Sequence, residues 1–406
     1  MSEKKIRKIL IVGVDTVSLA VSAKKAEYNV YAVDYFGDLD LRRVCSGCEA
    51  LIEQKSGKSC GKIGLLFKPE AFLNMAKSLV KKFVIDAILL SSGLDDDFEV
   101  LYALNELVAP ILGNQPKTIE KVRRKPEFFE ELKRLGIPHP ATLVVESLNG
   151  AMKAAKKLEF PVVVKPTKGF AGAGIRVSWN IEELERAFSH VSLFSKKVLI
   201  QKLVEGVHAS VSFLATSKDV KVLTVNEQLL GLHFLFQQEP FSYCGNIVPL
   251  HFADSIVEKC YTIIEKIALH FGLKGSNGID LVISKEGIPY VIEVNPRFQG
   301  TLECVEKVLG INLVESHVNA CLHGLLPQIR RKPSTFCIRL ILYAPKRVIA
   351  PDLTNFPQVR DIPLPGCIIE KGEPLCSVVV EGKSRSLALC KAKEIAKKIC
   401  DMLNSA

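Results

Sequence analysis

Two carboxylates and one amide are spaced so that a single turn of the chain can bring them together. Asp280 begins one apolar segment, and a glycine turn separates it from residues 290–295, which contain Glu293 and Asn295. The alternation of side chains on both sides of the turn predicts a β-hairpin. Carboxylate and amide oxygens without His or Cys suit Mg²⁺, which in proteins usually also binds substrate phosphates. Because Arg297 follows closely and can bind a phosphoryl group in bidentate fashion, the segment predicts a nucleotide-phosphate site.

A lysine and a glycine-rich loop form a second candidate phosphate site. Lys165 stands at the end of an apolar strand, just before residues 168–174, which contain Gly169, Gly172 and Gly174. Glycines allow the backbone to approach a phosphate closely and allow the loop to move. Hairpin turns also use glycines, so the prediction depends on the lysine before the loop and on the strand after it. No Gly-Lys-Ser/Thr leads into a helix, which excludes a Walker loop.

The first third of the chain alternates strands with helices. The apolar segments 7–14, 30–34 and 86–90 predict strands of a parallel α/β sheet. Ligands of such sheets bind beyond the carboxyl ends of the strands, where acidic loops stand at 34–38 and 91–97. For each single acidic residue we favour helix N-capping over substrate contact. The glycines of a dinucleotide fingerprint are missing, so NAD is not predicted.

The pattern changes near residue 115, which predicts three domains. Helices are expected over about 118–135 and 254–271, and the chain is rich in strands from about 197. Residues 330–333 resemble a linker, and the last segment predicts strands followed by a basic helix over 387–403. The expected fold class is α/β and α+β, with a parallel α/β domain at 1–115, a central domain at 116–328 and a small α+β domain at 329–406.

Composition excludes several classes of protein. The 406 residues are 48% hydrophobic and 24% charged, as in an ordinary globular enzyme, and no apolar run is long enough to span a bilayer. The N-terminus lacks the features of a signal peptide, so a cytoplasmic protein is expected. The net charge of +10 comes from basic residues spread along the chain, which favours a solvated surface over a nucleic-acid site.

The 12 cysteines are scattered, mostly in apolar contexts that predict buried side chains. Cys45, Cys48 and Cys60 form the one cluster, and zinc would need a fourth ligand that has no convincing candidate. Metal or redox use of this cluster is left open.

The order of the motifs over residues 115–325 resembles the ATP-grasp superfamily of carboxylate–amine and related ligases, including archaeal-type members that join amino acids. The motifs that carry the resemblance are Lys125 before a helix, Val163-Val164-Lys165-Pro166, the glycine loop, Leu199-Ile200-Gln201-Lys202-Leu203-Val204, and Asp280 with Glu293-Val294-Asn295-Pro296-Arg297. The N-terminal part resembles the domain that precedes the grasp. The C-terminal part resembles the small closing domain of the carboxylase-like branch.

The resemblance implies a role for each matching residue. Lys125 and Lys165 reach the nucleotide phosphates, and Gly169, Gly172 and Gly174 belong to the loop that closes over them. Gln201, Lys202, Leu203 and Val204 form the hinge at the adenine, and His208 contacts the ribose. Asp280, Glu293 and Asn295 bind one or two Mg²⁺ ions, for which Mn²⁺ can substitute, and Arg297 stabilises an acyl phosphate. Lys165 and Arg297 are the expected catalytic residues.

Other interpretations stay open for two of these residues. Lys125 could be a surface lysine, and His208 could be a core histidine with satisfied hydrogen bonds. Glu293 has no comparable alternative, because a carboxylate in an apolar strand is costly unless it is paired or binds a metal.

The implied function is an ATP-dependent, ADP-forming ligase that joins a small-molecule carboxylate to an amine, as a monomer or a homo-oligomer. Candidate specificity segments are residues 226–228, 238–246 and 298–301. One alternative is bicarbonate activation of the biotin-carboxylase kind. Another is a regulatory protein that binds a nucleotide without catalysis. No membrane or nucleic-acid partner is expected.

Overall fold

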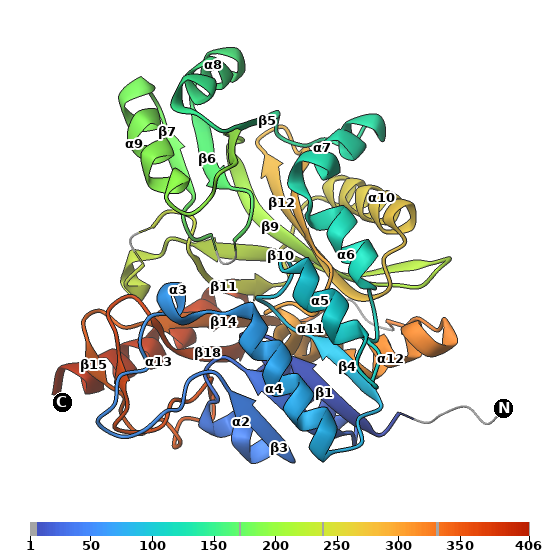
Figure 1. Cartoon of the computed structure of the whole chain (residues 1–406), viewed down its shortest axis with the longest axis vertical. Coiled ribbons are helices and arrows are strands. Elements are labelled where there is room, and N and C mark those ends of the chain that lie inside the picture. The colour runs from blue at the N-terminus through green and yellow to red at the C-terminus, as the bar shows by residue number, and fades with distance from the viewer. Residues whose placement is uncertain (1–5, 170–171, 238, 330–332, 406) are drawn as a thin grey trace.

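The computed structural model describes residues 6–169, 172–237, 239–329 and 333–405, and Figure 1 shows the whole chain. Within these ranges the strands form four sheets. One sheet is parallel and the larger ones after residue 115 are antiparallel, so the predicted mixture of α/β and α+β structure is confirmed. No helix in the described ranges is long and apolar enough to cross a membrane.

The N-terminal sheet is parallel, with the order β3-β2-β1-β4. Its strands are β1 (Lys8–Val12), β2 (Asn29–Asp34), β3 (Gly47–Ala50) and β4 (Ala87–Leu90). Alternate residues of β1, β2 and β4 pack against α1 (Val17–Lys25) on one face and against α4 (Pro69–Lys82) and α5 (Phe98–Asn105) on the other. Burial on both faces explains why these strands are continuous apolar runs. The short helices α2 (Leu39–Val44) and α3 (Ile63–Leu66) lie in the connections.

Two consecutive helices connect this sheet to the rest of the molecule. They are α6 (Pro116–Arg123) and α7 (Lys125–Arg134), each with a proline in its first turn, where the missing N–H is not needed. Gly136 follows α7 with a φ of +65°, the left-handed conformation that commonly ends a helix. The junction between the helices places Arg123 and Lys125, both buried, in the interior.

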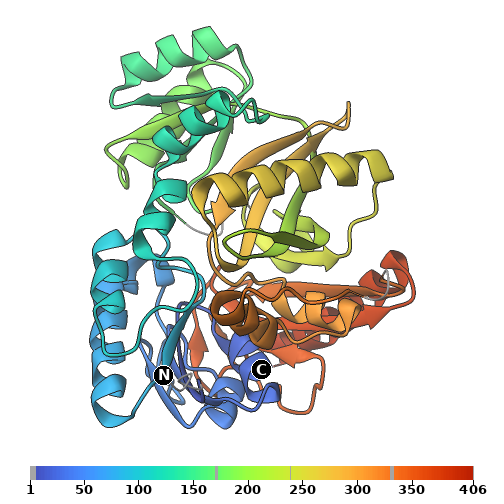
Figure 2. The same cartoon turned by 90° about the vertical axis from the view of Figure 1, so that its right-hand side faces the viewer.

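A small unit with its own sheet stands at the top of Figures 1 and 2. Its antiparallel strands are β5 (Thr142–Val145), β6 (Val162–Pro166), β7 (Arg176–Ser178) and β8 (Val198–Lys202), in the order β5-β8-β6-β7. The helices α8 (Leu148–Leu158) and α9 (Ile181–Ser192) cover the face that carries Val162, Val164 and Ile200. Lys165 and Gln201 therefore point from the opposite face.

The largest sheet has eight strands in the order β13-β12-β9-β10-β11-β14-β18-β16. The bounds of these strands are β9 (Gly206–Ala215), β10 (Val220–Leu230), β11 (Tyr243–Val248), β12 (Gly275–Ser284), β13 (Pro289–Asn295), β14 (Phe336–Tyr343), β16 (Val359–Arg360) and β18 (Pro374–Gly382). A short 3₁₀ helix, η1 (His233–Leu235), precedes β11, and β15 (Val348–Ile349) pairs with β17 (Ile368–Ile369) in a two-stranded sheet.

One face of this sheet is apolar along its length. The helix α10 (Asp254–Phe271) covers it over β9, β12 and β13, and α13 (Arg385–Ser405) covers it over β14 and β18. The opposite face packs against α11 (Leu302–Leu309), α12 (Leu313–His323) and α1 through residues such as Leu214 and Cys337. The predicted helices over 254–271 and 387–403 are confirmed, with the second extending to Arg385 and Ser405.

The centre of the second face is polar, in rows that cross several strands. Glu293, Asp280, Ser210 and Asn226 occupy matched positions on β13, β12, β9 and β10. A neighbouring row consists of Gln228, Asn246 and Arg339 on β10, β11 and β14. Matched residues of paired strands point to the same side, so both rows face the N-terminal sheet rather than α10.

The acidic loops of the N-terminal sheet do not act as helix caps. Asp38 and Asp97 occupy N-cap positions of α2 and α5, but neither side chain makes a capping hydrogen bond. Asp38 instead accepts from Gln54, while Asp95 and Asp96 pair with arginines. The capping interpretation is wrong for Asp38 and Asp97, which make no capping hydrogen bond, and Asp38, Asp95 and Asp96 instead have partners from other parts of the chain. Residues 330–332 of the predicted linker lie outside the described ranges.

Candidate active site

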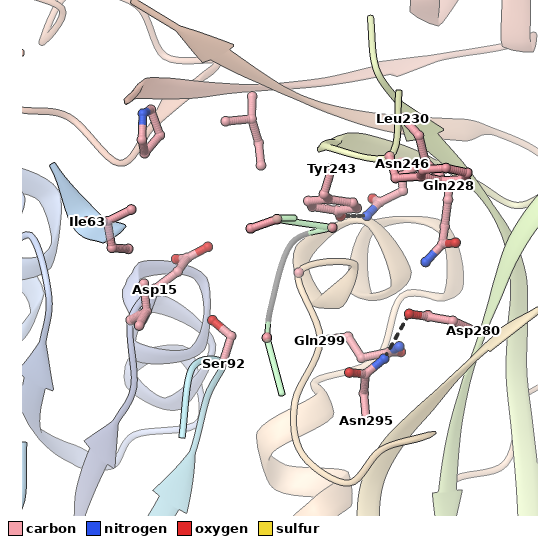
Figure 3. Close-up of a pocket in the computed structure, with 18 of the residues that line it drawn as sticks. Asp15, Ile63, Ser92, Gln228, Leu230, Tyr243, Asn246, Asp280, Asn295 and Gln299 are labelled. Atoms are coloured by element: carbon pink, nitrogen blue, oxygen red, sulfur yellow. Dashed lines mark hydrogen bonds between the residues drawn. The ribbon is translucent and has the colours of Figure 1, made fainter. Parts of the chain in front are cut away.

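A cavity of about 480 Å³ lies where the three larger sheets meet. It is lined by loops at the carboxyl ends of β1, β2 and β4, by the inner face of the small unit, and by the polar face of the eight-stranded sheet. Figure 3 shows Asp15 and Ser92 on one side of this space and Gln228, Tyr243, Asn246, Asp280, Asn295 and Gln299 on the other. Of the candidate site residues that the sequence predicts, all line the cavity except Gly174.

The hairpin of β12 and β13 contains a β-bulge that directs Glu293 into the cavity. Leu281 pairs with Val291 but Asp280 pairs with Glu293, so Ile292 is an extra residue in β13. In a regular strand Val291 and Glu293 would share one face, and Val291 packs in the core beneath α10. The bulge moves Glu293 to the polar face, opposite Asp280.

Glu293 lies among three positive charges. Its Oε2 is 3.4 Å from Nη1 of Arg123 and 3.7 Å from Nζ of Lys125. Burial alone would raise its pKa, but Arg123, Lys125 and Lys165 lower it below the ordinary value. Glu293 is therefore ionised at neutral pH, as a metal ligand must be.

Asp280 and Asn295 complete the predicted metal site. The Nδ2 of Asn295 donates to Oδ2 of Asp280 over 3.2 Å, as the dashed line in Figure 3 shows. Burial and the nearby charge of Glu293 raise the pKa of Asp280 to about 7. Two partly buried carboxylates that repel each other, beside an amide oxygen, fit a divalent cation, because the cation would remove this repulsion. Among the described residues no set of three or more His, Cys, Asp or Glu side chains is arranged to bind a metal, so the amide belongs to the proposed set.

Arg297 is held by a carboxylate from the N-terminal sheet. Its Nε donates to Oδ2 of Asp95 over 3.0 Å, and its Nη2 donates to Oδ1 of Asn295 over 3.3 Å. Asp95 and Arg297 are separated by about half of the chain, so this ion pair joins the N-terminal sheet to the hairpin of β12 and β13. The pair fixes the guanidinium beside the predicted ligands.

Lys165 enters the cavity from the small unit. Its Nζ donates to Oε1 of Gln201 over 2.9 Å and lies 5.8 Å from the centre of the Phe129 ring. Burial, and next the charge of Lys125, lower the pKa of Lys165 to about 7. An anion bound beside both lysines would be attracted by two desolvated charges, which is the arrangement that phosphate binding requires.

The described part of the glycine loop is docked on two elements. The amide of Gly169 donates to Oδ2 of Asp96 over 3.1 Å. Gly172 has a φ of +77°, and a Cβ atom there would overlap the carbonyl oxygen of Phe241. Phe170 and Ala171, also part of the predicted loop, lie outside the described residues. The glycines thus permit both the conformation and the close approach to the segment before β11.

The predicted hinge and ribose residues line the same cavity. Gln201 and Lys202 end β8, and Leu203 and Val204 follow it, with the amide of Leu203 donating to the carbonyl of Pro161. Lys202 turns away, because its Nζ donates to the carbonyl of Glu159. His208 on β9 is partly buried, lies edge-on to Phe241, and has a pKa lowered by burial.

Four polar residues in or beside the site are missing from the sequence prediction. Arg123 is 4% exposed and binds Asp96 through two hydrogen bonds of 2.8 and 2.9 Å. Asp95 and Asp96 lie in an acidic loop whose carboxylates are predicted to cap helices. Arg339, on β14, lines the cavity from beyond the predicted central domain. A buried arginine in the apolar strand Phe336–Tyr343 is the one sequence feature that could have indicated the last of these.

The cysteine cluster remains without a metal geometry. Burial raises the pKa of the Cys45 and Cys48 thiols, which favours the inert thiol form. Cys60 instead lies against Cys367, far along the chain. Within the described residues these three cysteines thus form no common ligand set.

Residues 122–301 match a family model described as an ATP-grasp domain. Over 383 residues the chain is 26% identical to an uncharacterised protein of Methanocaldococcus jannaschii, covering 94% of this chain and 90% of that protein. It is 30% identical over 220 residues to the carbamoyl phosphate synthase large chain of Pyrococcus furiosus, covering 53% of this chain and 20% of that one. The chain therefore spans about a fifth of the synthase.

The fold also matches solved structures over nearly its whole length. The biotin carboxylase domain of 2-oxoglutarate carboxylase from Hydrogenobacter thermophilus, solved with MgADP and bicarbonate, superimposes with a TM-score of 0.75. The match covers 96% of this chain and 89% of that domain at 18% sequence identity. At this identity the likeness concerns the fold.

Proposed function

We propose that this chain is an ATP-grasp ligase that forms ADP, activates a small-molecule carboxylate and joins it to an amine. The observation that carries the proposal is the convergence of Lys125, Lys165, Asp280, Glu293 and Arg297 on one cavity. Two lysines for phosphates, two carboxylates for a cation and one arginine are what ATP-dependent phosphoryl transfer to a carboxylate requires.

The proposed reaction has two steps. The substrate carboxylate attacks the γ-phosphorus of ATP, the bond to the β,γ-bridging oxygen breaks, and an acyl phosphate and ADP form. A neutral amine then attacks the acyl carbon, loses a proton, and displaces inorganic phosphate, which leaves an amide. The transfer needs positioning and neutralisation of charge, and no protein nucleophile.

The residues of this chain have separate parts in these steps. Lys125 and Lys165 bind the phosphate oxygens, and Arg297, held by Asp95, stabilises the charge of the acyl phosphate. Asp280, Glu293 and Asn295 would hold Mg²⁺, which when bound neutralises phosphate charge. The glycine loop, docked between Asp96 and Phe241, excludes water that would hydrolyse the acyl phosphate.

A screen of ADP release over acids, amines and amino acids tests the proposal. Release that needs an acid and an amine together supports the ligase. Release that needs only bicarbonate would instead support carboxylation chemistry. Tight binding of Mg-ATP with no release for any pair would favour a regulatory nucleotide-binding protein.

The variant Glu293→Gln tests the assignment of the metal ligands. We expect ADP release to fall roughly 100-fold or more, because the amide keeps the shape of the side chain and loses the charge. Glu182→Gln, at an exposed position in the first turn of α9, is the matched control. Near-normal turnover in Glu293→Gln would rule out the proposed ligand set.

A further inference from the structure

The cavity has a second compartment that the ATP chemistry does not use. It is lined by Asp15, Asp34, Asp38, Asp361 and Arg339, and we call these five residues the anionic compartment. They come from the loops after β1 and β2, from β14, and from the residue after β16. Two of the four carboxylates, those of Asp15 and Asp361, contact the guanidinium of Arg339.

The charge of Arg339 is already compensated. Its Nη2 donates to Oδ2 of Asp15 over 2.8 Å and to Oδ2 of Asp361 over 2.7 Å. Its Nη1 donates to the carbonyl of Gly300 over 3.3 Å. Arg339 is therefore a poor site for a further anion, and the compartment contains more carboxyl groups than positive side chains.

The carboxyl groups of the compartment also act on one another. Burial, and then the charges of Asp34 and Asp361, raise the pKa of Asp38 well above its ordinary value. Burial, and then Asp15, raise the pKa of Asp361 to about 7. A positive group bound here would be stabilised by the same charges that now repel one another.

Two buried oxygen atoms at this compartment lack a hydrogen-bond donor among the described residues. Asn246, 1% exposed, donates its Nδ2 to the Tyr243 hydroxyl, and its Oδ1 has no donor. Asn246 lies directly opposite Arg339 in the sheet, and Figure 3 shows it with Tyr243 at the wall of the cavity. Oδ1 of Asp361 is the second such atom. Both are acceptors, so the missing ligand atom is an N–H or O–H donor.

The backbone of Asp361 adds an independent indication. Its φ is +57°, a conformation that costs energy for residues other than glycine and often marks a functional site. The amide of Asp361 is fixed by Oδ2 of Asp40 over 2.9 Å, so the loop is built to present this carboxylate. Among the described residues these carboxylates form no set of three that could hold a metal ion.

We propose that the anionic compartment binds an ammonium group of the substrate that is not the reacting nitrogen. The inference rests on the proposed ligase function. A nitrogen that attacks an acyl phosphate must be neutral, whereas a nitrogen among carboxylates keeps its proton. One of the two joined molecules therefore carries an ammonium group in addition to its reacting group, as a diamine or an amino acid does.

The two compartments adjoin, as this substrate requires. Arg339 contacts the carbonyl of Gly300, which is the third residue after Arg297. A Cβ atom on Gly300 would lie 3.3 Å from the Tyr243 hydroxyl and 3.6 Å from Nη1 of Arg339. Arg297, Gly300 and the anionic compartment thus line the same cavity.

Binding of matched probes to the full chain with Mg-ADP tests the inference. The pairs are L-lysine and L-norleucine, 1,4-diaminobutane and 1-aminobutane, and 4-aminobutanoate and butanoate. Each pair differs by one ammonium group. We expect at least one ammonium probe to bind about tenfold or more tightly than its partner in calorimetry. Equal binding within every pair, or binding by none of the six, would overturn the inference.

Substitutions locate the binding. Asp361→Asn should abolish the preference within the responsive pair, and asparagine suits the left-handed conformation of this residue. Asp15→Asn, at a more exposed position, provides the same test if Asp361→Asn does not fold. Asp219→Asn, on an exposed turn, is the control. A preference that survives both Asp361→Asn and Asp15→Asn would contradict the assignment.

The outcomes separate this inference from the proposed function. Mg-ADP binding does not depend on the anionic compartment, so it should persist in Asp361→Asn. If wild-type protein releases ADP with neutral acids and amines and ignores ammonium probes, the inference fails and the ligase stands. If Mg-ATP does not bind, the ligase proposal itself fails.

Discussion

Arg123 holds two carboxylates of the site in place through the centre of the molecule. It forms two hydrogen bonds with Asp96, lies 3.4 Å from Glu293, and donates to the carbonyl of Val294. Asp96 in turn accepts from the amide of Gly169 in the glycine loop. The buried side chain of Arg123 therefore links the N-terminal sheet, the hairpin of β12 and β13, and the glycine loop.

The variant Arg123→Met should destabilise the protein strongly. Removal of the guanidinium leaves Asp96 and Glu293 without their main buried partner, and we expect the free energy of unfolding to fall by about 3–5 kcal/mol. Urea unfolding measures this. Arg134→Met removes an exposed partner of Glu131 and should cost less than about 1 kcal/mol. Similar costs for the two variants would mean that the Arg123 network does not stabilise the fold.

His317 makes stability depend on pH. Its Nδ1 accepts from the amide of Ser276 over 2.8 Å, and its Nε2 therefore carries the hydrogen that is donated to the carbonyl of Leu112. Burial lowers the pKa of His317 to about 4. Below pH 6.5, His317 becomes protonated in the unfolded chain but stays neutral in the folded chain. The stability that is present above pH 6.5 is therefore lost as the pH falls toward 4.

The variant His317→Gln isolates this effect. Glutamine can donate and accept as the neutral imidazole does, but it does not titrate. Between pH 7 and 4 the wild-type protein should lose up to roughly 3 kcal/mol more stability than the variant, as urea unfolding at each pH would show. An identical pH dependence in both proteins would contradict a buried neutral histidine.

At the scale of elements, the close contact between the glycine loop and the segment before β11 depends on Gly172. A Cβ atom at this position overlaps the Phe241 carbonyl, whereas at Gly174, with a similar φ of +76°, the nearest atom is 3.8 Å away. Gly172→Ala should therefore lower ADP release about tenfold more than Gly174→Ala, because only the first substitution undocks the loop. Equal losses would show that backbone strain, and not the contact, matters.

The elements also show which features can be predicted from sequence. The hairpin, the long helix before it and the lysine at the end of β6 follow from patterns of a few adjacent residues, and the structure has them. The bulge at Ile292 does not follow from such a pattern, because regular alternation over Tyr290–Val294 would place Val291 and Glu293 on one face. The partners of Asp95 and Asp96 come from α6 and from the segment after β13, so no local pattern could reveal them.

At the scale of the whole molecule, the eight-stranded sheet crosses the predicted boundary at residue 328. Strand β11 from the central part pairs with β14 from the C-terminal part over four residue pairs. Figure 2 shows the C-terminal strands beside the central ones. The three-domain division stays a prediction. Arg339 reaches the cavity through this continuity, which explains why a site sought within the grasp region alone omits it.

Binding of a nucleotide between the parts should stabilise the whole chain. At about 100 times its Kd, Mg-ADP is expected to raise the free energy of unfolding by about 2.7 kcal/mol. Chelation of the metal with EDTA should reduce this gain, and Glu293→Gln should make the gain insensitive to EDTA. Thermal unfolding with each addition measures the effect. A gain in wild-type protein that EDTA does not alter would contradict a metal held by Asp280 and Glu293.

Because β13 contains one extra residue, the side to which Glu293 points depends on whether residues are gained or lost in even or odd numbers before it. Adding or deleting two residues between Pro289 and Glu293 leaves the carboxylate pointing into the cavity, whereas a change of one would turn it toward α10. Relatives that catalyse the same reaction should therefore differ by even numbers of residues in the segment that corresponds to Pro289–Glu293. A difference of one residue in this segment would indicate either an error in the alignment or a protein that no longer catalyses the reaction.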